Sequence, residues 1–188
     1  MSGLENKKSK IIIIALFFVL GIAIGFWAGF YFCRENIVEV SPLGNSQYEA
    51  GEYVGTYSVA RVIDGDTIEI GGGERVRYIG IDSPEMALDG KPADCYAQKA
   101  TDKNRELVSG KIVELRKDVS DRDKYGRLLR YVFVDGIFVN AELVREGFAS
   151  AWAYPPDVKY QDEISIAQTE AQKNKAGLWT ACPQNPIK

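Results

Sequence analysis

The sequence contains no histidine and few cysteines. Among its 188 residues there are three cysteines and no His. Without histidine the chain cannot form a Ser-His-Asp triad, a Cys-His dyad or a metal site with imidazole ligands. Three cysteines are too few for a zinc site made of cysteine alone. General acid–base chemistry must therefore come from carboxylates, lysine, tyrosine or water polarised by arginine.

The chain also lacks an excess of positive charge. It has 23 Lys and Arg against 26 Asp and Glu, a formal net charge of −3. Residues 1–34 hold four basic residues and one acidic residue, which leaves 19 basic and 25 acidic residues in 35–188, a net charge of −6. Taken alone, this balance argues against nucleic acid as a partner. The length allows one domain of ordinary size with a short additional segment.

The N-terminal region has the pattern of a membrane segment. Residues 1–10 form a basic flank with three lysines, and residues 11–33 (IIIIALFFVLGIAIGFWAGFYFC) contain no charge. As a helix this run is about 34 Å long, enough to cross a hydrocarbon core of about 30 Å. The alternative is a cleaved signal peptide, whose apolar region is usually only about 7–15 residues and ends in small residues. This run is longer and ends in the bulky FYFC, so we expect an uncleaved signal anchor, a single transmembrane helix.

The flanks of this segment predict its orientation. The basic N-terminal side favours a cytoplasmic N-terminus and a domain outside the cytoplasm, and cleavage of the segment would give a secreted protein. Gly21, Gly25 and Gly29 lie four apart on one helix face, which permits a weak homodimer. The simpler explanation is that glycine is common in membrane helices. Residues 34–54 are polar with Pro and Gly and are predicted to be a linker.

The remaining sequence predicts strands followed by a mixture of helices and strands. Alternating apolar residues and turn residues predict strands over 55–64, 67–70, 75–81, 111–115 and 128–134. Helical spacing predicts helices over 95–108, 138–146 and 160–175, the last with Ile164, Ala167 and Ala171 facing inward. Five short strands with interleaved helices predict an α+β domain built on a small OB-type barrel. On composition alone, a generic α+β domain is the alternative.

Four acidic residues lie next to the predicted turns. Asp64 and Asp66 belong to the turn Asp64-Gly65-Asp66, and Asp82 and Glu85 follow the third strand. In a simple meander we expect these two places at opposite ends, so that they meet only if the first strand is long and curls. Carboxylate and carbonyl oxygens without His or Cys suit Ca²⁺ or Mg²⁺. Taken singly, each motif is also explained as an ordinary turn or loop start.

Two arginines complete the set of candidate residues. Arg77 lies inside an otherwise apolar strand, and a guanidinium that points into a barrel mouth needs an anionic partner. Arg127 ends the charged segment 121–127 directly before a predicted strand, so it is held at a strand start. A solvated charged loop is the alternative for this segment.

Three blocks of these residues resemble the signature blocks of the staphylococcal nuclease (thermonuclease) family. They are Val62–Thr67 (VIDGDT), Arg77–Glu85 (RYIGIDSPE) and Asp123–Arg127 (DKYGR), in the family's order and local spacing. The likeness extends through Val139–Gly147 to Gly177–Trp179 and covers roughly residues 55–180, with 181–188 left as a C-terminal tail. The resemblance implies an OB barrel with three helices. It also implies Ca²⁺-dependent cleavage of DNA and RNA phosphodiesters, leaving a 3′-phosphate and a 5′-hydroxyl.

The resemblance assigns a metal and water site by position. Asp66, Asp82 and the backbone carbonyl of Ser83 would bind Ca²⁺, and Asp64 would support them. Glu85 would hold or deprotonate the attacking water. Ser83 stands where the family's founding member has Thr, which changes nothing if only the carbonyl binds the metal.

The resemblance also assigns residues to the substrate. Arg77 and Arg127 would bind the phosphate, where two guanidinium groups and a dication stabilise the developing negative charge. Lys124 and Tyr125 match substrate-side positions. Trp152 and Tyr154 match aromatics that stack on a base or sugar, which favours single-stranded substrate. Simple packing below the barrel is the alternative for these two.

The sequence departs from the founding member at two further places. Residues 86–94 do not align with its loop. Cys95 and Cys182 are additional, and outside the membrane two thiols in one small domain could form a disulfide that ties the first helix to the C-terminal tail. This pairing is a hypothesis.

Two functions remain to be compared. One is a membrane-anchored, Ca²⁺-dependent nuclease, and the other is a non-catalytic OB-fold module that binds nucleic acid or protein at the membrane. The arginine and carboxylate set is complete, which favours the enzyme. The acidic balance is then less decisive, because Asp64, Asp66, Asp82 and Glu85 would lie beside a cation.

Overall fold

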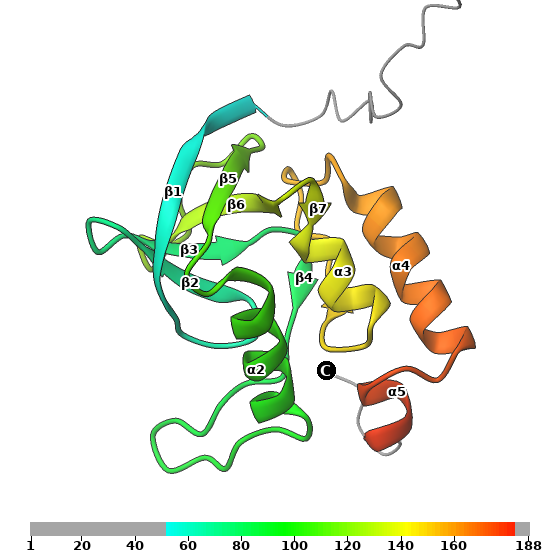
Figure 1. The fold of residues 1–188 in the computed structure, drawn as a ribbon. Coiled ribbons are helices and arrows are strands. Elements are labelled where there is room, and N and C mark those ends of the chain that lie inside the picture. Colours follow the sequence, from blue (N-terminus) through cyan, green and yellow to red (C-terminus); the bar gives the residue numbers. More distant parts are fainter. Residues whose placement is uncertain (1–51, 183–188) are drawn as a thin grey trace, which may run out of the picture. The chain divides into compact units, whose positions relative to one another are not determined.

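The structure is a computed structural model that describes residues 52–182 (Figure 1). Its strands are β1 (Glu52–Val62), β2 (Thr67–Ile70), β3 (Arg75–Tyr78), β4 (Ile81–Asp82), β5 (Ile112–Lys117), β6 (Leu128–Val134), β7 (Ile137–Phe138) and β8 (Ser150–Ala151). Its helices are α2 (Ala97–Val108), α3 (Val139–Arg145), α4 (Gln161–Lys173) and the single turn α5 (Leu178–Ala181).

Five of the described strands close into a barrel. The larger sheet has the order β3-β2-β1-β5-β6-β7, and an additional pairing between β3 and β6 closes it. The β3–β6 pairing is parallel, and the other pairings in the barrel are antiparallel. The α+β fold with a five-stranded barrel is therefore as the sequence predicts. In Figure 1 the barrel and α2 lie on one side, and α3 and α4 pack together on the other.

Strand β1 is longer than predicted and pairs with two neighbours. Its first part, Glu52–Ser58, runs antiparallel to β5, and its last part, Val59–Val62, runs antiparallel to β2. Irregular register between Tyr53 and Gly55 lets the strand bend. The predicted linker therefore ends before residue 52, because Glu52 and Tyr53 already pair with β5.

The barrel core consists of the inward side chains of its strands. Ile68, Val76, Val113 and Val132 are fully buried, each worth about 1.5–3 kcal/mol relative to an exposed position. Helix α4 packs against α3 and β8, and the three residues that the sequence predicts to face inward, Ile164, Ala167 and Ala171, are all fully buried.

The strand predicted over 75–81 is divided in two. β3 ends at Tyr78, and Gly80 has a φ of 82°, a left-handed conformation that suits glycine. An added Cβ there would lie 2.6 Å from Ile164 Cδ1, so the chain passes close to α4. After this turn β4 leaves the barrel and pairs with β8, Asp82 opposite Ser150.

The ends of the domain also differ from the prediction. Helix α2 begins at Ala97 instead of Cys95, because Asp94 and Cys95 belong to the preceding loop. At the C-terminus α5 continues to Ala181, and the buried Cys182 follows it, so the folded part extends beyond residue 180.

The predicted membrane segment cannot be compared with this structure. Residues 11–33, with Gly21, Gly25 and Gly29, lie outside the described residues, as do the basic flank, most of the linker and residues 183–188. Within 52–182, no helix combines the length and the apolar character that crossing a bilayer requires.

Candidate active site

The β1–β2 turn carries the first two acidic residues. The Asp66 amide donates to Asp64 Oδ1 at 3.0 Å, and the Asp64 amide donates to the Thr67 carbonyl at 3.3 Å. Gly65 lies between them, and an added Cβ there would be 2.7 Å from Ser83 Cβ. The turn therefore needs glycine because it packs directly against the segment that follows β4.

The register of β2 and β3 brings this turn to Arg77. Thr67 pairs with Arg77, and the Tyr78 amide donates to the Asp66 carbonyl at 2.9 Å. Because β2 and β3 are antiparallel, the start of β2 and the end of β3 lie at the same end of the barrel. The expectation that they lie at opposite ends was wrong, and curling of β1 is not what brings them together.

The Arg77 side chain lies between two carboxylates. Its Nε is 3.2 Å from Asp66 Oδ1, and its Nη2 is 3.0 Å from Asp82 Oδ1. Its Nη1 donates to the carbonyls of Tyr78 and Ile81 at 2.8 and 2.9 Å. Only 16% of this side chain is exposed. The guanidinium is thus fixed by two charges and two backbone oxygens.

Ser83 joins the same cluster through its backbone. Its amide donates to Asp66 Oδ2 at 2.7 Å, and Thr67 Oγ1 donates to Asp66 Oδ1 at 3.2 Å. Asp66 is only 5% exposed. Four predicted site residues therefore meet in one place: Asp66, Arg77, Asp82 and Ser83.

Three carboxyl groups around Arg77 have raised pKa values. Burial is the largest cause at each of three residues, and the charge of Asp66 adds to it. Together they raise the pKa of Asp64 to about 6 and also raise the pKa values of Asp82 and Glu85. Arg77 opposes the shift at all three carboxyls. A bound cation would relieve this crowding of negative charge.

Glu85 lies near these charges at the start of an exposed loop. The charges of Asp66 and Asp82 both act on its carboxyl. Its backbone is held by Asp94, whose Oδ2 accepts from the Glu85 amide at 3.1 Å and whose amide donates to the Glu85 carbonyl at 2.9 Å.

Arg127 is held by its own loop. Its Nε is 2.7 Å from Asp123 Oδ2, and Asp123 Oδ1 accepts from the amides of Tyr125 and Arg127 at 2.9 and 3.0 Å. The guanidinium carbon of Arg127 and the Nζ of Lys124 lie 5.5 and 5.0 Å from the centre of the Tyr125 ring. Tyr125 itself is largely exposed.

The two arginines come from neighbouring strands. β3 and β6 are parallel, with Val76 opposite Leu128 and Arg77 opposite Leu129. Arg127 directly precedes Leu128, the residue that pairs with Val76 next to Arg77. Within residues 52–182 it forms no hydrogen bond or ion pair with the carboxylates around Arg77.

The two candidate aromatic residues follow β8. The Trp152 amide donates to the Gly80 carbonyl at 2.8 Å, which places Trp152 beside the chain leading to Asp82. Trp152 is 48% exposed and Tyr154 is 69% exposed. Neither is part of the barrel core, so their rings are available to a ligand.

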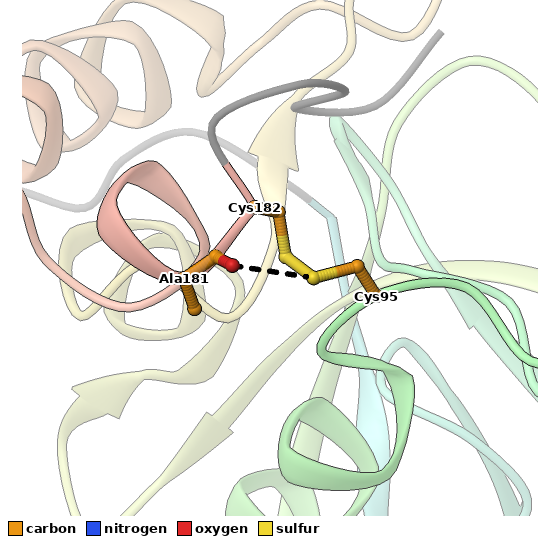
Figure 2. The surroundings of a disulfide bond; sticks show 3 residues. All are labelled: Cys95, Ala181 and Cys182. Atoms are coloured by element: carbon orange, nitrogen blue, oxygen red, sulfur yellow. Dashed lines mark hydrogen bonds between the residues drawn. A yellow bond between two sulfur atoms is a disulfide. The ribbon is translucent and has the colours of Figure 1, made fainter.

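Cys95 and Cys182 form a disulfide in the structure (Figure 2). Their Cα atoms are 6.0 Å apart, and the bond connects the loop before α2 with the residue after α5. Cys95 Sγ also lies 3.6 Å from the Ala181 carbonyl oxygen, a contact without a proton because the sulfur is oxidised.

The chemistry of this cluster fits a hard cation. Its donors are oxygens only, and Asp82 Oδ2 accepts no hydrogen bond from any described residue. Within 52–182 no group of three acidic side chains is already arranged as a metal-binding cluster, and Arg77 lies between Asp66 and Asp82. A cation here would therefore rely on backbone oxygen and water in addition to carboxylates.

Comparison of the sequence with known proteins identifies the family of this chain. The sequence model described as "Staphylococcal nuclease homologue" matches residues 75–181, more than half of the chain. The chain belongs to the staphylococcal nuclease family. The matched region contains β3 with Arg77, the segment of Asp82 to Glu85 and the Arg127 loop.

Individual relatives cover most of the same region. A thermonuclease of Staphylococcus hyicus is 40% identical over 128 residues, which is 66% of this chain and 76% of that protein. A thermonuclease of Staphylococcus intermedius is 42% identical over 127 residues, again 66% of this chain and 76% of that protein. Endonuclease YncB of Bacillus subtilis is 42% identical over 128 residues, 64% of this chain and 59% of that protein.

Four residues of this nuclease-family site were not assigned from the sequence. They are Gly65 and Asp94, described above, Asp123, which orients Arg127, and Asn104. Asn104 is fully buried on α2, where its Nδ2 donates to the Asp64 carbonyl at 2.9 Å and its Oδ1 accepts from Tyr78 at 3.0 Å. A polar residue on the apolar face of a predicted helix was the available signal.

Proposed function

We propose that this chain is a Ca²⁺-dependent nuclease that hydrolyses phosphodiester bonds of DNA and RNA. The observation that carries the proposal is the position of Arg77 between Asp66 and Asp82, with the Ser83 amide on Asp66. This cluster combines a fixed guanidinium with oxygen ligands, which is what charge stabilisation at a phosphate requires. Membership of the staphylococcal nuclease family supports the same reaction.

Asp66, Asp82 and the Ser83 carbonyl would hold the cation, and Asp64 would support them from the neighbouring turn. When bound, Ca²⁺ supplies positive charge against the phosphoryl oxygens. Burial raises the pKa values of Asp64 and Asp82, and the charge of Asp66 adds to this effect while Arg77 opposes it, which supports a site that favours an additional cation. The donor set consists of hard oxygens, the preference of this ion.

Glu85 is assigned to the attacking water. It would orient the water and accept its proton as the new P–O bond forms, while the P–O5′ bond breaks and the departing O5′ takes a proton from solvent water. The products would be a 3′-phosphate and a 5′-hydroxyl, as the family resemblance implies. Its raised pKa moves this carboxylate toward the range in which a general base is effective.

Arg77 and Arg127 would bind the phosphate. Each guanidinium has a carboxylate partner that fixes its orientation, Asp82 for Arg77 and Asp123 for Arg127. Groups oriented before the reaction need no reorganisation as charge develops. Arginine suits this role because its planar fork binds two oxygens and stays protonated.

Lys124, Tyr125, Trp152 and Tyr154 would contact the rest of the nucleic acid. Tyr125, Trp152 and Tyr154 are exposed, so their rings can stack on bases, an interaction that tolerates any sequence and favours single strands. The net charge of the chain then predicts weak non-specific binding and fast release.

We further propose that the enzyme works outside the cytoplasm, anchored by residues 11–33 or secreted if that segment is cleaved. A disulfide between Cys95 and Cys182 supports an oxidising compartment. The weak homodimer through Gly21, Gly25 and Gly29 belongs to the same proposal. Protease protection of the full-length protein in right-side-out vesicles tests the orientation: residues 35–188 should be digested without detergent.

The activity is tested with a single-stranded oligonucleotide. We expect cleavage with Ca²⁺, none with excess chelator, and 5′-hydroxyl ends that polynucleotide kinase labels without prior dephosphorylation. The competing function is a non-catalytic OB-fold module. It would bind the oligonucleotide in the presence of Ca²⁺ and leave it intact at enzyme concentrations well above the substrate concentration.

A further inference from the structure

The segment between β4 and α2 forms an irregular hairpin. Leu88 and Lys91 exchange two backbone hydrogen bonds of 3.2 and 2.9 Å. Between them Asp89 and Gly90 have φ values of 50° and 82°, as a two-residue turn of type I′ requires. The hairpin leaves the site directly after Ser83.

Glu85 and Asp94 form the base of this hairpin. They occupy the same register as Leu88 and Lys91, and the Asp94 amide donates to the Glu85 carbonyl at 2.9 Å. The return hydrogen bond is unusual, because the Glu85 amide donates to the Asp94 side chain, at 3.1 Å, instead of its carbonyl. The Asp94 carbonyl accepts from the Ala97 amide at 3.1 Å, at the start of α2. Asp94 therefore links Glu85 to α2.

The residues after Asp94 fix its position. Cys95 is bonded to Cys182, the residue that follows α5 (Figure 2). Tyr96 stacks on Phe148, with ring centres 5.6 Å apart. Asp94 is thus attached to the folded domain from its C-terminal side.

The hairpin itself has little hydrophobic support. Residues 87–95 are all exposed, and Leu88 is 69% exposed. A segment with few buried contacts opens at a low free-energy cost. Apart from its attachment to the buried Ser83 and Pro84, the Glu85 backbone is therefore held by the Asp94 hydrogen bonds and by the disulfide next to them.

We propose that Asp94 is a positioning residue for Glu85, and that the Cys95–Cys182 disulfide holds Asp94 in place. The catalytic consequence rests on the proposed function, in which Glu85 acts on the attacking water. A displacement of a reacting group by about 1 Å can cost up to about 10²-fold in rate. We expect about a tenfold effect, because Glu85 remains attached through Pro84 to the buried Ser83.

The first experiment compares Asp94→Ala, which removes the acceptor, with Asp94→Asn, which keeps an acceptor oxygen. Asp102→Ala is the matched control, since Asp102 is an exposed aspartate on α2. Hydrogen–deuterium exchange of the Glu85 amide is measured on the full-length protein without Ca²⁺. We expect exchange at least about fivefold faster in Asp94→Ala, and near-wild-type exchange in Asp94→Asn and Asp102→Ala. Unchanged exchange in Asp94→Ala would overturn the proposal.

Catalysis gives the second measurement. With Ca²⁺, Asp94→Ala should lower kcat about tenfold with little change in KM, and Asp94→Asn should restore most of the loss. Equal kcat in Asp94→Ala and the wild type would refute the positioning role. A wild type without nuclease activity would refute the proposed function instead, and the exchange measurement would still decide whether Asp94 holds Glu85.

The disulfide is tested in the same way. Thiol titration of the denatured, unreduced protein should find one free cysteine, Cys33, and three after reduction. The variant Cys95→Ser/Cys182→Ser should speed exchange at Glu85 and lower kcat. Because the disulfide acts through Asp94, adding Asp94→Ala to this variant should cause much less than a further tenfold loss. Three free thiols without reduction, or effects that multiply fully, would contradict this part of the proposal.

Discussion

Asp66 and Ser83 are joined by a 2.7 Å hydrogen bond across 17 positions of the sequence, from the Ser83 amide to Asp66 Oδ2. This bond connects the β1–β2 turn with the segment after β4. Gly65 belongs to this turn and packs against Ser83. There is space at Gly65 for a hydrogen atom and none for a methyl group.

The first prediction concerns Gly65. In Gly65→Ala the new Cβ would lie 2.7 Å from Ser83 Cβ and 2.9 Å from Ala100 Cβ, so the turn and the Ser83 segment must separate. We expect a loss of about 1–3 kcal/mol in the free energy of unfolding and weaker Ca²⁺ binding, measured by urea denaturation and calorimetry. In the control Gly71→Ala the nearest atom to the new Cβ is the rotatable Ser58 hydroxyl at 3.0 Å, and the Ser58 carbonyl oxygen lies at an ordinary contact distance of 3.9 Å. Equal behaviour of the two variants would contradict the close packing.

The second prediction concerns Arg77→Lys. Lysine keeps the charge but cannot bind Asp66, Asp82 and two backbone carbonyls with one planar fork. We expect kcat to fall by about 10²–10³ with the fold retained, as judged by circular dichroism. Arg61→Lys is the control, since Arg61 pairs with Glu69 on the exposed surface. A kcat within a factor of about three of the wild type would remove Arg77 from the phosphate site.

The third prediction is a pH dependence. The pKa of Asp64 is raised to about 6 in the folded protein, so the folded state binds more protons than the unfolded state between about pH 4 and pH 6. Without Ca²⁺, the free energy of unfolding should therefore decrease as pH rises through this range. Because protons and the cation compete for the same carboxylates, the Ca²⁺-induced rise in Tm should be larger at pH 7 than at pH 5.

Asp64→Asn provides the check on this prediction. It removes the titrating group, so the Ca²⁺-free stability should vary less between pH 4 and pH 6 than in the wild type. A wild-type stability that rises with pH in this range would show that Asp64 is not the dominant group.

The barrel and the residues that meet around Arg77 could be predicted from the sequence. The turn at Asp64-Gly65-Asp66 and the alternation in β2 and β3 identify the strands, and the arginines and carboxylates indicate the chemistry that we propose for them. Their spatial relation was predicted incorrectly, because the ends of a meander were compared without the antiparallel direction of β2 and β3.

The supporting interactions were harder to predict. Asp94 reaches the Glu85 backbone only because the turn at Asp89-Gly90 sets the register of the hairpin. Its position also depends on the disulfide formed by the next residue, Cys95. Asn104 contributes only because α2 packs with this residue toward the Asp64 turn. Both depend on packing between distant segments, which hydrophobic periodicity does not encode.

The fourth prediction separates the water site from the metal site. Glu85→Gln removes the proposed base but none of the proposed Ca²⁺ ligands, so kcat should fall by about 10²–10⁴ while the Ca²⁺-induced rise in Tm remains. Asp66→Asn should abolish the rise in Tm as well as the activity, because Asp66 is the most buried of these carboxylates. If Glu85→Gln also lost the rise in Tm, Glu85 would have to be counted among the metal ligands.

The final prediction concerns Trp152, whose side chain is 48% exposed beside the chain that leads to Asp82. If its ring stacks on a base, Trp152→Ala should raise KM for a single-stranded oligonucleotide by about tenfold, since one stacked base contributes about 1–3 kcal/mol. The kcat at saturation should change little, because the ring is remote from the bonds that break. Trp152→Phe should recover most of the affinity.

Tyr53→Ala is the matched control for Trp152→Ala, since Tyr53 is an aromatic residue with 59% exposure at the start of β1. The alternative role for Trp152 is structural packing below the barrel. In that case Trp152→Ala would lower the Tm and leave KM unchanged in the fraction that remains folded. If Trp152→Ala raises KM without lowering the Tm, and Tyr53→Ala does neither, Trp152 contacts the substrate. A packing role would lower the Tm, whereas stacking on a base affects only the binding of nucleic acid.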